Sequence, residues 1–377
     1  MRRSSFLFLP FLFLFLISST LTLSILSGCS HNQTKEKNFF RALWIKNLDP
    51  KSETGNLPIS FLSPLIYEDM LFSGDGSGFL HAYNVENGRE LWKAKEKNEI
   101  TTAPAVFKDM VIYGTADGRV IARNTLNGEI VYSVDLGDSV ETAASLDDKE
   151  RAYVQLRSHK VYSIDANTGK ILWNYNRTIS LKTTIHTSST PKFFKNRVYV
   201  GFADGSVVAL SADDGSLVWE RNISIGSKFI DVDMTPTFHD GLLYICSRAG
   251  VLTILNPDTG VILRKFDHKI LRPPLFINEH MLIGSENGHL YKLDKLGNII
   301  DEKDFTHPIL HILQWQNNIL LTTQGSEVFV LNPQKLQTLD TFTLGHRYSL
   351  IFGDPTINKN KLGLFSSRNR LYVFEPL

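Results

Sequence analysis

The sequence contains very little cysteine: its 377 residues include only Cys29 and Cys246. Two cysteines exclude a framework of several disulfide bonds, and no Cys or His pairs stand at the spacing of a zinc site. Cys246 lies in the apolar run LLYICS, which predicts a buried, unreactive thiol. The fold must therefore depend on an apolar core, and 42% of the residues are hydrophobic.

An excess of charge of either sign is also missing. The chain has 40 Lys and Arg against 39 Asp and Glu, a formal net charge of +1. Without a basic field, nothing attracts a polyanion, which argues against a nucleic acid partner.

The patterns that mark catalysis are absent as well. The sequence has no glycine-rich phosphate loop and no nucleophile-elbow motif. The eleven His residues are scattered, most of them in expected turns, and His81, His159 and His289 fall at repeat positions. The sequence therefore predicts no catalytic set, no metal site and no bound cofactor.

The longest apolar run lies at the start of the chain. Arg2 and Arg3 precede an almost wholly apolar stretch from Phe6 to Leu26, followed by LSGC, which ends at Cys29. A basic start, an apolar core and small residues before a cleavage point are typical of a secretory signal, although an uncleaved membrane anchor is the alternative. Removing residues 1–28 takes away two Arg, so the mature formal charge is 38 minus 39, or −1.

LSGC resembles a bacterial lipobox, in which the Cys becomes the lipidated first residue of the mature chain. The resemblance implies lipidation of Cys29, and the Ser30 that follows implies sorting to the outer membrane. Residues 30–38, SHNQTKEKN, are polar and without periodicity. We therefore expect a signal peptide at 1–28, a lipidated Cys and flexible tether at 29–38, and a globular part at 39–377.

An internal repeat runs through that globular part. A Pro precedes a Gly by 14 residues five times, at Pro64, Pro104, Pro191, Pro236 and Pro274, and the spacing between equivalent positions is about 40 residues. Turn dipeptides such as DG, NG and TG separate four short apolar alternations per unit, and no segment after residue 30 has helical periodicity. This pattern is typical of four-stranded β-propeller blades.

The number of units predicts an all-β, eight-bladed propeller. The expected third strand occurs eight times, from GFLHAYN to NRLYVFE, and the eighth unit has no fourth strand after it. ALWIKNL, residues 42–48, matches the fourth strands ELWKAK and ILWNYN. We expect this N-terminal strand to complete the last blade and close the ring, which hides the last sheet edges. A pair of smaller β domains is the alternative. The outer strand of unit seven, QTLDTF at 337–342, is the weakest match.

The stretches SIDANTGKILW, residues 163–173, and ALSADDGSLVW, residues 209–219, resemble the quinoprotein-type propeller repeat. That repeat occurs in enzymes that carry pyrroloquinoline quinone (PQQ) and in non-enzymatic relatives. The resemblance leaves a periplasmic PQQ-dependent oxidoreductase as one possible function. The tryptophans are explained by packing between blades, with the indole N–H on a backbone acceptor. The chain lacks the long insertions and adjacent cysteines of the quinoprotein dehydrogenases, so we expect no enzyme activity.

A lipobox, a short tether and eight minimal blades together resemble the BamB family, lipoproteins of the outer-membrane β-barrel assembly (BAM) machinery. The most specific local match is DVDMTP, Asp231–Pro236, which is similar to the family's Asp-x-Asp-x-Thr-Pro stretch. The resemblance implies a scaffold at the periplasmic face of the outer membrane, anchored by lipid. It also implies that Asp231 and Asp233 contact a periplasmic POTRA domain of BamA, and that the chain assists the insertion of unfolded β-barrel proteins beside other BAM subunits.

A second contact segment of the family corresponds to Thr183, Ile185 and His186 here. Ile185 matches an apolar position, while His186 replaces an Arg and Thr183 replaces a Leu. The permanently charged donor fork of Arg is therefore missing.

The acids of DVD leave three interpretations open. They could cap turns of a solvated loop, bind a hard cation, or present fixed negative charge to a partner's basic patch. Two carboxylates supply too few oxygens for calcium, and the family resemblance favours the partner surface. A lipoprotein adaptor of another envelope complex would have the same fold.

Overall fold

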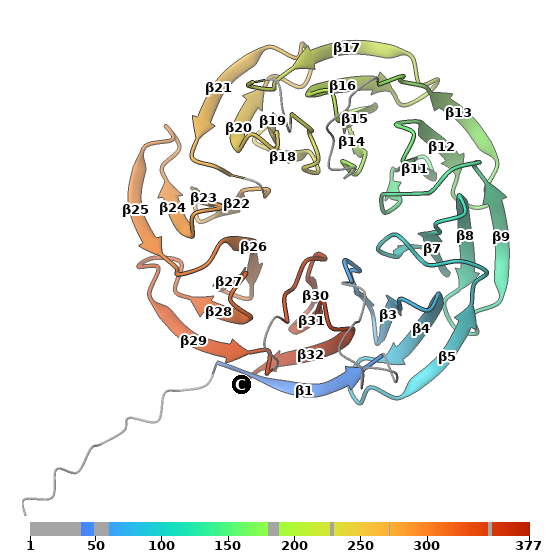
Figure 1. Ribbon diagram of the computed structural model, residues 1–377, viewed down its shortest axis with the longest axis horizontal. Coiled ribbons are helices and arrows are strands. Elements are labelled where there is room, and N and C mark those ends of the chain that lie inside the picture. The colour runs from blue at the N-terminus through green and yellow to red at the C-terminus, as the bar shows by residue number, and fades with distance from the viewer. Residues whose placement is uncertain (1–38, 49–59, 180–187, 227–229, 271, 346–348) are drawn as a thin grey trace, which may run out of the picture. The chain divides into compact units, whose positions relative to one another are not determined.

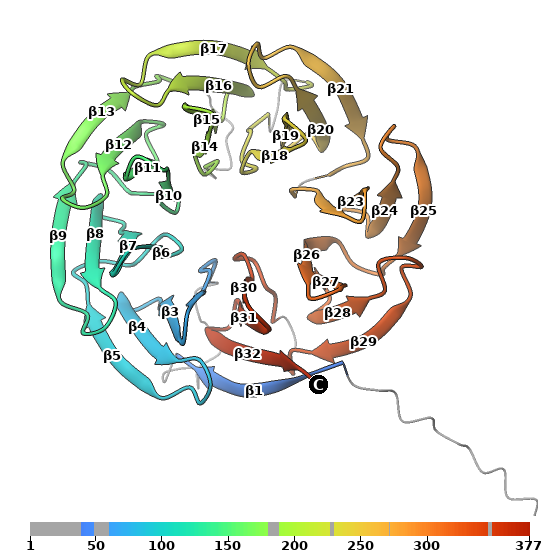
Figure 2. The same ribbon diagram turned by 180° about the vertical axis from the view of Figure 1, so that it is seen from behind.

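The computed structural model describes residues 39–48, 60–179, 188–226, 230–270, 272–345 and 349–377. These residues form 32 strands in eight four-stranded antiparallel sheets, which are arranged as a ring (Figure 1, Figure 2). The described part of the chain contains no helix, and accordingly none that could cross a membrane. The prediction of an eight-bladed propeller is confirmed.

Each blade is one sheet, and we number the blades in chain order. Blade 1 consists of β2 (Leu65–Tyr67), β3 (Met70–Gly74), β4 (Phe79–Asn84) and β5 (Glu90–Lys95). Blade 2 consists of β6 (Ala105–Phe107), β7 (Met110–Gly114), β8 (Arg119–Asn124) and β9 (Ile130–Asp135). Blade 3 consists of β10 (Ser145–Leu146), β11 (Arg151–Gln155), β12 (Val161–Asp165) and β13 (Ile171–Tyr175). Blade 4 consists of β14 (Lys192–Phe194), β15 (Arg197–Gly201), β16 (Ser206–Ser211) and β17 (Leu217–Asn222).

The remaining four blades follow the same plan. Blade 5 consists of β18 (Thr237–His239), β19 (Leu242–Cys246), β20 (Val251–Leu255) and β21 (Ile262–Asp267). Blade 6 consists of β22 (Leu275–Ile277), β23 (His280–Gly284), β24 (His289–Leu293) and β25 (Ile299–Asp304). Blade 7 consists of β26 (Ile309–Trp315), β27 (Asn318–Thr323), β28 (Glu327–Leu331) and β29 (Thr338–Thr343). Blade 8 consists of β30 (Thr356–Asn358), β31 (Lys361–Phe365), β32 (Arg370–Pro376) and β1 (Phe40–Asn47).

Burial changes from the middle strands to the rim of the ring. All five residues of β7, MVIYG, are buried, because both faces of this strand pack against other blades. The outer strand β9, IVYSVD, alternates between exposed and half-buried residues, as expected for a strand with one face in solvent. Figure 1 shows these outer strands, such as β9 and β17, along the outer edge of the ring.

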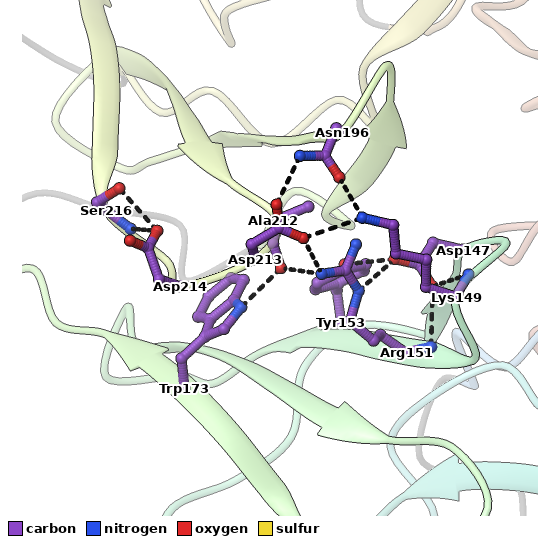
Figure 3. A network of polar contacts seen from close by, with 10 residues as sticks. All are labelled: Asp147, Lys149, Arg151, Tyr153, Trp173, Asn196, Ala212, Asp213, Asp214 and Ser216. Atoms are coloured by element: carbon purple, nitrogen blue, oxygen red, sulfur yellow. Dashed lines mark hydrogen bonds and ion pairs between the residues drawn. The ribbon is translucent and has the colours of Figure 1, made fainter.

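Aromatic residues on five of the outer strands join neighbouring blades. The indole Nε1 of Trp173 donates a hydrogen bond to the carbonyl oxygen of Ala212 in the next blade at 2.9 Å (Figure 3). Trp44, Trp92 and Trp219 donate equivalent bonds of 2.8 Å each to the carbonyls of Val85, Thr125 and Pro257. These four rings and Tyr132 each lie on the hairpin glycine of the following blade: Trp173 on Gly215, Trp44 on Gly88, Trp92 on Gly128, Trp219 on Gly260 and Tyr132 on Gly169. The predicted role of the tryptophans in packing between blades is confirmed.

Polar side chains strengthen the joint between blades 3 and 4. Arg151 donates to the carboxylate of Asp147 at 2.6 Å, to the carbonyl of Ala212 at 2.6 Å and to Asp213 at 2.9 Å (Figure 3). Tyr153 donates its hydroxyl to Asp147 at 2.7 Å. Burial would raise the pKa of Asp147, but these hydrogen bonds to its charged form outweigh burial and lower it.

The N-terminal strand closes the ring. β1 pairs antiparallel with β32, in a register that runs from Phe40 opposite Pro376 to Asn47 opposite Arg370. Arg41 and Glu375 form an ion pair of 2.7 Å across this pairing. The predicted closure of the last blade by the start of the globular part is confirmed (Figure 1).

Blade 7 departs from the repeat, as the sequence indicated. Its inner strand β26 has seven residues instead of the usual three, with an irregular register between Ile309 and His311. Leu336 has a positive φ of 52° at the hairpin position where blades 1 to 6 have glycine. The outer strand β29 begins one residue later than QTLDTF predicted.

Candidate partner-binding surface

The antiparallel order of each blade divides the turns of the ring between two faces. Connections between blades and the turns between second and third strands lie at one face, which we call the connection face. Turns between first and second and between third and fourth strands lie at the opposite face, the hairpin face. Asp231–Pro236 directly precedes β18, so this loop lies on the connection face, as the sequence predicted.

Three hydrogen bonds fix the 231–236 loop against neighbouring segments. Val232 N donates to the carbonyl of Phe202 at 3.0 Å, and Arg248 N donates to the carbonyl of Asp231 at 2.7 Å. Ser189 donates its hydroxyl to the carbonyl of Met234 at 2.9 Å. The side chains of Val232 and Met234 are buried in an apolar cluster that blades 4, 5 and 6 share. The loop is therefore held in one conformation rather than loosely solvated.

Gly201 allows the loop to approach β15 closely. A Cβ atom on this glycine would lie 2.4 Å from the carbonyl oxygen of Val232, a distance that real Cβ atoms do not reach. The last residue of β15 must consequently be glycine for the loop to take this path.

The two acids of the loop have different environments. Asp231 is fully buried, so its carboxylate is not presented on the surface as fixed negative charge. The Asp233 side chain is 15% exposed, and its carboxylate lies 3.4 Å from Nη1 of Arg248. The expectation of two surface acids therefore needs correcting to one partly exposed carboxylate beside an arginine, because the loop backbone turns Asp231 inward. Contact of either acid with a partner stays a prediction.

The second predicted contact segment, with Thr183, Ile185 and His186, lies outside the described residues. Ser189, which follows it closely, is described and bonds to Met234. Ser189 therefore joins the 231–236 loop on the connection face.

Charged side chains on the same face were missed by the sequence reasoning. Arg177, which follows β13, donates to Asp204 at 2.5 Å and to Glu220 at 2.8 Å. The hydrogen bond that Arg177 donates to Glu220 contributes most to raising the pKa of Arg177. The repeat alignment could have placed Arg177 and Asp204 on this face, but the pairing depends on side-chain directions that the repeat does not specify.

Cys246 is buried, as predicted. Burial, and secondarily the negative charge of Asp233, raise the pKa of its thiol. Among the residues that the structure describes, no three His, Cys, Asp or Glu side chains group as a metal site requires. Cys29 lies outside the described residues.

The sequence matches the family described as "Outer membrane protein assembly factor BamB" over residues 41–176 and 127–297, which together span more than half of the chain. The chain belongs to the BamB family. The matched region includes the 231–236 loop. No curated protein matches the sequence significantly.

Solved structures share the fold of this chain. BamB from Moraxella catarrhalis is 21% identical, with a TM-score of 0.75 over 89% of this chain and 99% of that one. The computationally designed Ika8 protein is 16% identical, with a TM-score of 0.70 over 85% of this chain and 98% of that one. The quinohemoprotein alcohol dehydrogenase ADHIIG from Pseudomonas putida HK5 is 12% identical, with a TM-score of 0.70 over 90% of this chain and 76% of that one. A BamB protein, a designed protein and an alcohol dehydrogenase thus share one fold, so these similarities are evidence of fold alone.

Proposed function

We propose that the protein is a non-enzymatic scaffold of the BAM machinery, which docks through its connection face on the periplasmic POTRA domains of BamA. The match to the assembly-factor family over residues 41–297, with the 231–236 loop inside it, carries the proposal. In this role the chain works beside other BAM subunits and assists the insertion of β-barrel proteins, whose unfolded strands it holds or orients.

The geometry of the connection face supports docking. The 231–236 loop is anchored by hydrogen bonds to Phe202, Arg248 and Ser189, so little conformational entropy is lost when a partner binds it. Asp233 and Arg248 offer an acceptor and a donor side by side at its edge. A partner strand or loop with a complementary ion pair would fit this edge, and charge complementarity would fix its register.

The N-terminal segment supplies the anchor in this proposal. Residues 1–28 act as the signal peptide, Cys29 carries the lipid, and residues 29–38 tether the propeller to the periplasmic face of the outer membrane. Tethering raises the effective concentration of the propeller near a membrane-embedded partner. Replacing Cys29 by Ala should release the protein into the soluble periplasmic fraction. A Cys29→Ala protein that stays in the outer membrane would contradict lipid anchoring.

The docking proposal is tested by affinity purification from detergent-solubilised envelopes, with partners identified by mass spectrometry. The native chain should recover BamA, and the double variant Asp233→Lys plus Arg248→Glu should recover at least about tenfold less. Asp148→Lys is the control for the Asp233 substitution, because it makes the same Asp-to-Lys change on an exposed turn of the hairpin face. Equal recovery with the double variant would place the contact elsewhere. Failure to recover BamA with the native chain would contradict the function.

The quinoprotein-like alternative has its own test. Added PQQ should neither bind the purified protein nor give dye-linked oxidation of an alcohol or sugar. Saturable PQQ binding with turnover would overturn the non-enzymatic role.

A further inference from the structure

At the junction between blades 5 and 6, an arginine stands at the position from which an aromatic ring joins five other pairs of blades. The equivalent residues of blades 6 and 7 are Asp301 and Asp340. In blade 4, Trp219 stands opposite Ala209 in the register of the last two strands. The equivalent position in blade 5 is Arg264, opposite Ile254. Here an arginine replaces the ring, and the glycine of the next hairpin is Gly297.

The other aromatic walls of this junction are retained. Tyr244 and Phe276 meet edge to face with ring centroids 4.9 Å apart and 64° between planes. Tyr199 and Phe238 of the preceding junction have nearly the same geometry, at 5.0 Å and 64°. There Tyr199 also touches the Trp219 ring, at 5.9 Å between centroids. In the junction between blades 5 and 6 the Arg264 guanidinium and the edge of the Phe266 ring cover Gly297, and a space lined by the same walls remains beside them.

A cavity of about 640 Å³ occupies that space. Its apolar lining comes from both blades and includes Tyr244, Leu263, Phe266, Phe276 and Met281. Leu263 is 53% exposed, so the lining continues to the outer surface of the ring. A volume of this size lies in the range of ligand-binding pockets.

The floor of the cavity at Gly297 is covered by the Arg264 guanidinium and the edge of the Phe266 ring. The five hairpin glycines beneath aromatic rings are buried, whereas Gly297 is only half-buried. The Arg264 side chain donates to the carbonyl of Leu296 and places its guanidinium 4.7 Å from the centre of the Phe266 ring. Tyr199 donates its hydroxyl to Pro257, but the Tyr244 hydroxyl has no protein acceptor in the described part of the chain.

The position of the cavity separates it from the connection face. Its border includes the turn between β18 and β19, at Asp240, and the turn between β24 and β25, at Lys295. Both are turns of the hairpin face. An occupant of this cavity would leave the 231–236 loop free for another partner.

We propose that this cavity binds an aromatic side chain, above all tryptophan, presented by an extended polypeptide partner. Four of the five filled junctions show an indole in the equivalent place, delivered from a β-strand, with its N–H on a backbone carbonyl. An incoming ring would pack against Tyr244 and Phe276, beside the Arg264 guanidinium and the Phe266 ring edge that cover Gly297. The partner's backbone would run along the outer strand β21, which is the free edge of blade 5.

Methionine methyl groups provide the readout, because the sequence contains five Met and Met281 alone lines the cavity. The purified full chain in detergent, with ¹³C-labelled methionine methyls, is titrated with acetyl-Ala-Trp-Ala-amide, with acetyl-Ala-Leu-Ala-amide and with free indole. The tryptophan peptide should shift the Met281 signal saturably and leave Met70, Met110 and Met234 unchanged. The leucine peptide should bind at least about tenfold more weakly.

Three outcomes of that titration would overturn the proposal. The first is an absent or non-saturable Met281 shift, and the second is equal affinity for both peptides. The third is binding of indole without binding of the tryptophan peptide, since the site would then serve a small molecule rather than a polypeptide.

Substitutions at Arg264 locate the binding. Arg264→Trp supplies the ring from within and should weaken peptide binding at least about tenfold, whereas Arg264→Ala keeps the cavity open and should preserve it. The three other methionine signals report whether each variant is folded. If the Trp variant is not folded, Arg264→Tyr offers the smaller ring that blade 2 uses at Tyr132. Unchanged binding to a folded variant with either ring, or loss of binding in folded Arg264→Ala, would contradict the assignment.

Discussion

The indole ring of Trp173 lies directly on Gly215 of the next blade. A Cβ atom on this glycine would come within 2.5 Å of Cε3 of the ring. The Trp173 ring is also fixed by its hydrogen bond to Ala212, three residues before that glycine. Ring, glycine and carbonyl therefore form one unit that joins blade 3 to blade 4.

Gly215→Ala should consequently destabilise the protein more than the backbone conformation alone requires. Gly241 has the same φ of 74° and no atom within 4 Å of a Cβ, so Gly241→Ala measures the conformational cost by itself. We expect Gly241→Ala to cost about 1 kcal/mol and Gly215→Ala at least about 1 kcal/mol more, measured as free energies of unfolding in urea. Equal losses would show that the ring moves aside at no cost.

Ring closure should depend on the buried part of β1. Phe40 is buried and meets Trp315 at 5.6 Å and Phe374 at 5.4 Å between ring centroids. We expect Phe40→Ala to lower the free energy of unfolding by about 3–5 kcal/mol. Ile45, on the same strand, is 48% exposed, and Ile45→Ala should change it by only about 0.5 kcal/mol. Similar losses for both substitutions would mean that β1 contributes chiefly through its backbone pairing.

The joint between blades 3 and 4 should weaken in acid. Hydrogen bonds from Asn196, Arg151 and Lys149 lower the pKa of Asp213, and the pKa of Asp147 is also lowered. A carboxyl with a depressed folded pKa stabilises the protein above its unfolded pKa of about 4, and this contribution is lost as the pH falls toward the folded value. The free energy of unfolding should therefore fall between about pH 5 and pH 3.

Asp147→Asn isolates one contribution to that acid sensitivity. The Asp147 side chain is inaccessible to solvent and bonded to Arg151, so the variant should be less stable at pH 7. Its stability should also change less between pH 5 and pH 3 than that of the native chain. Parallel pH profiles for the two proteins would contradict the role of Asp147.

The path of the 231–236 loop should control partner capture in the proposed function. In Gly201→Ala the new methyl group meets the carbonyl of Val232, so the loop must move. Gly114 is the equivalent residue of blade 2, where a Cβ meets Val140 at 2.5 Å, and Gly114→Ala is the matched control. Recovery of BamA should fall at least about tenfold for Gly201→Ala and stay unchanged for Gly114→Ala. Equal recovery with both would remove the loop from the interface.

Most of the fold could be predicted from the sequence, because the pattern of each strand recurs in eight repeat units. The match between ALWIKNL and the other fourth strands was sufficient to predict closure of blade 8 by β1. The environment of Asp231 could not be predicted in this way. A loop between blades has no periodicity, and only the contacts of Val232 and Phe202 determine which way its carboxylates point.

The cavity between blades 5 and 6 could be predicted from the sequence only in part. The exchange of Trp for Arg at position 264 is visible in the repeat alignment. How neighbouring side chains fill the missing ring's place depends on packing. The Arg264 guanidinium and the edge of the Phe266 ring cover Gly297, while the rings of Tyr244 and Phe276 keep the geometry of a filled junction.

Closure of the ring by β1 also sets an order of events during biosynthesis. β1 is made before all the other strands, yet its partner β32 is made last, so β1 must wait for the whole propeller. A contact between segments so distant in sequence forms slowly, and until it forms β32 offers an unpaired edge to any extended chain nearby. A second copy of the same chain could supply that strand, and the two copies would then exchange their first strands. The pairing of β1 with β32 that completes the monomer is therefore also the place where newly made molecules can most easily pair with one another.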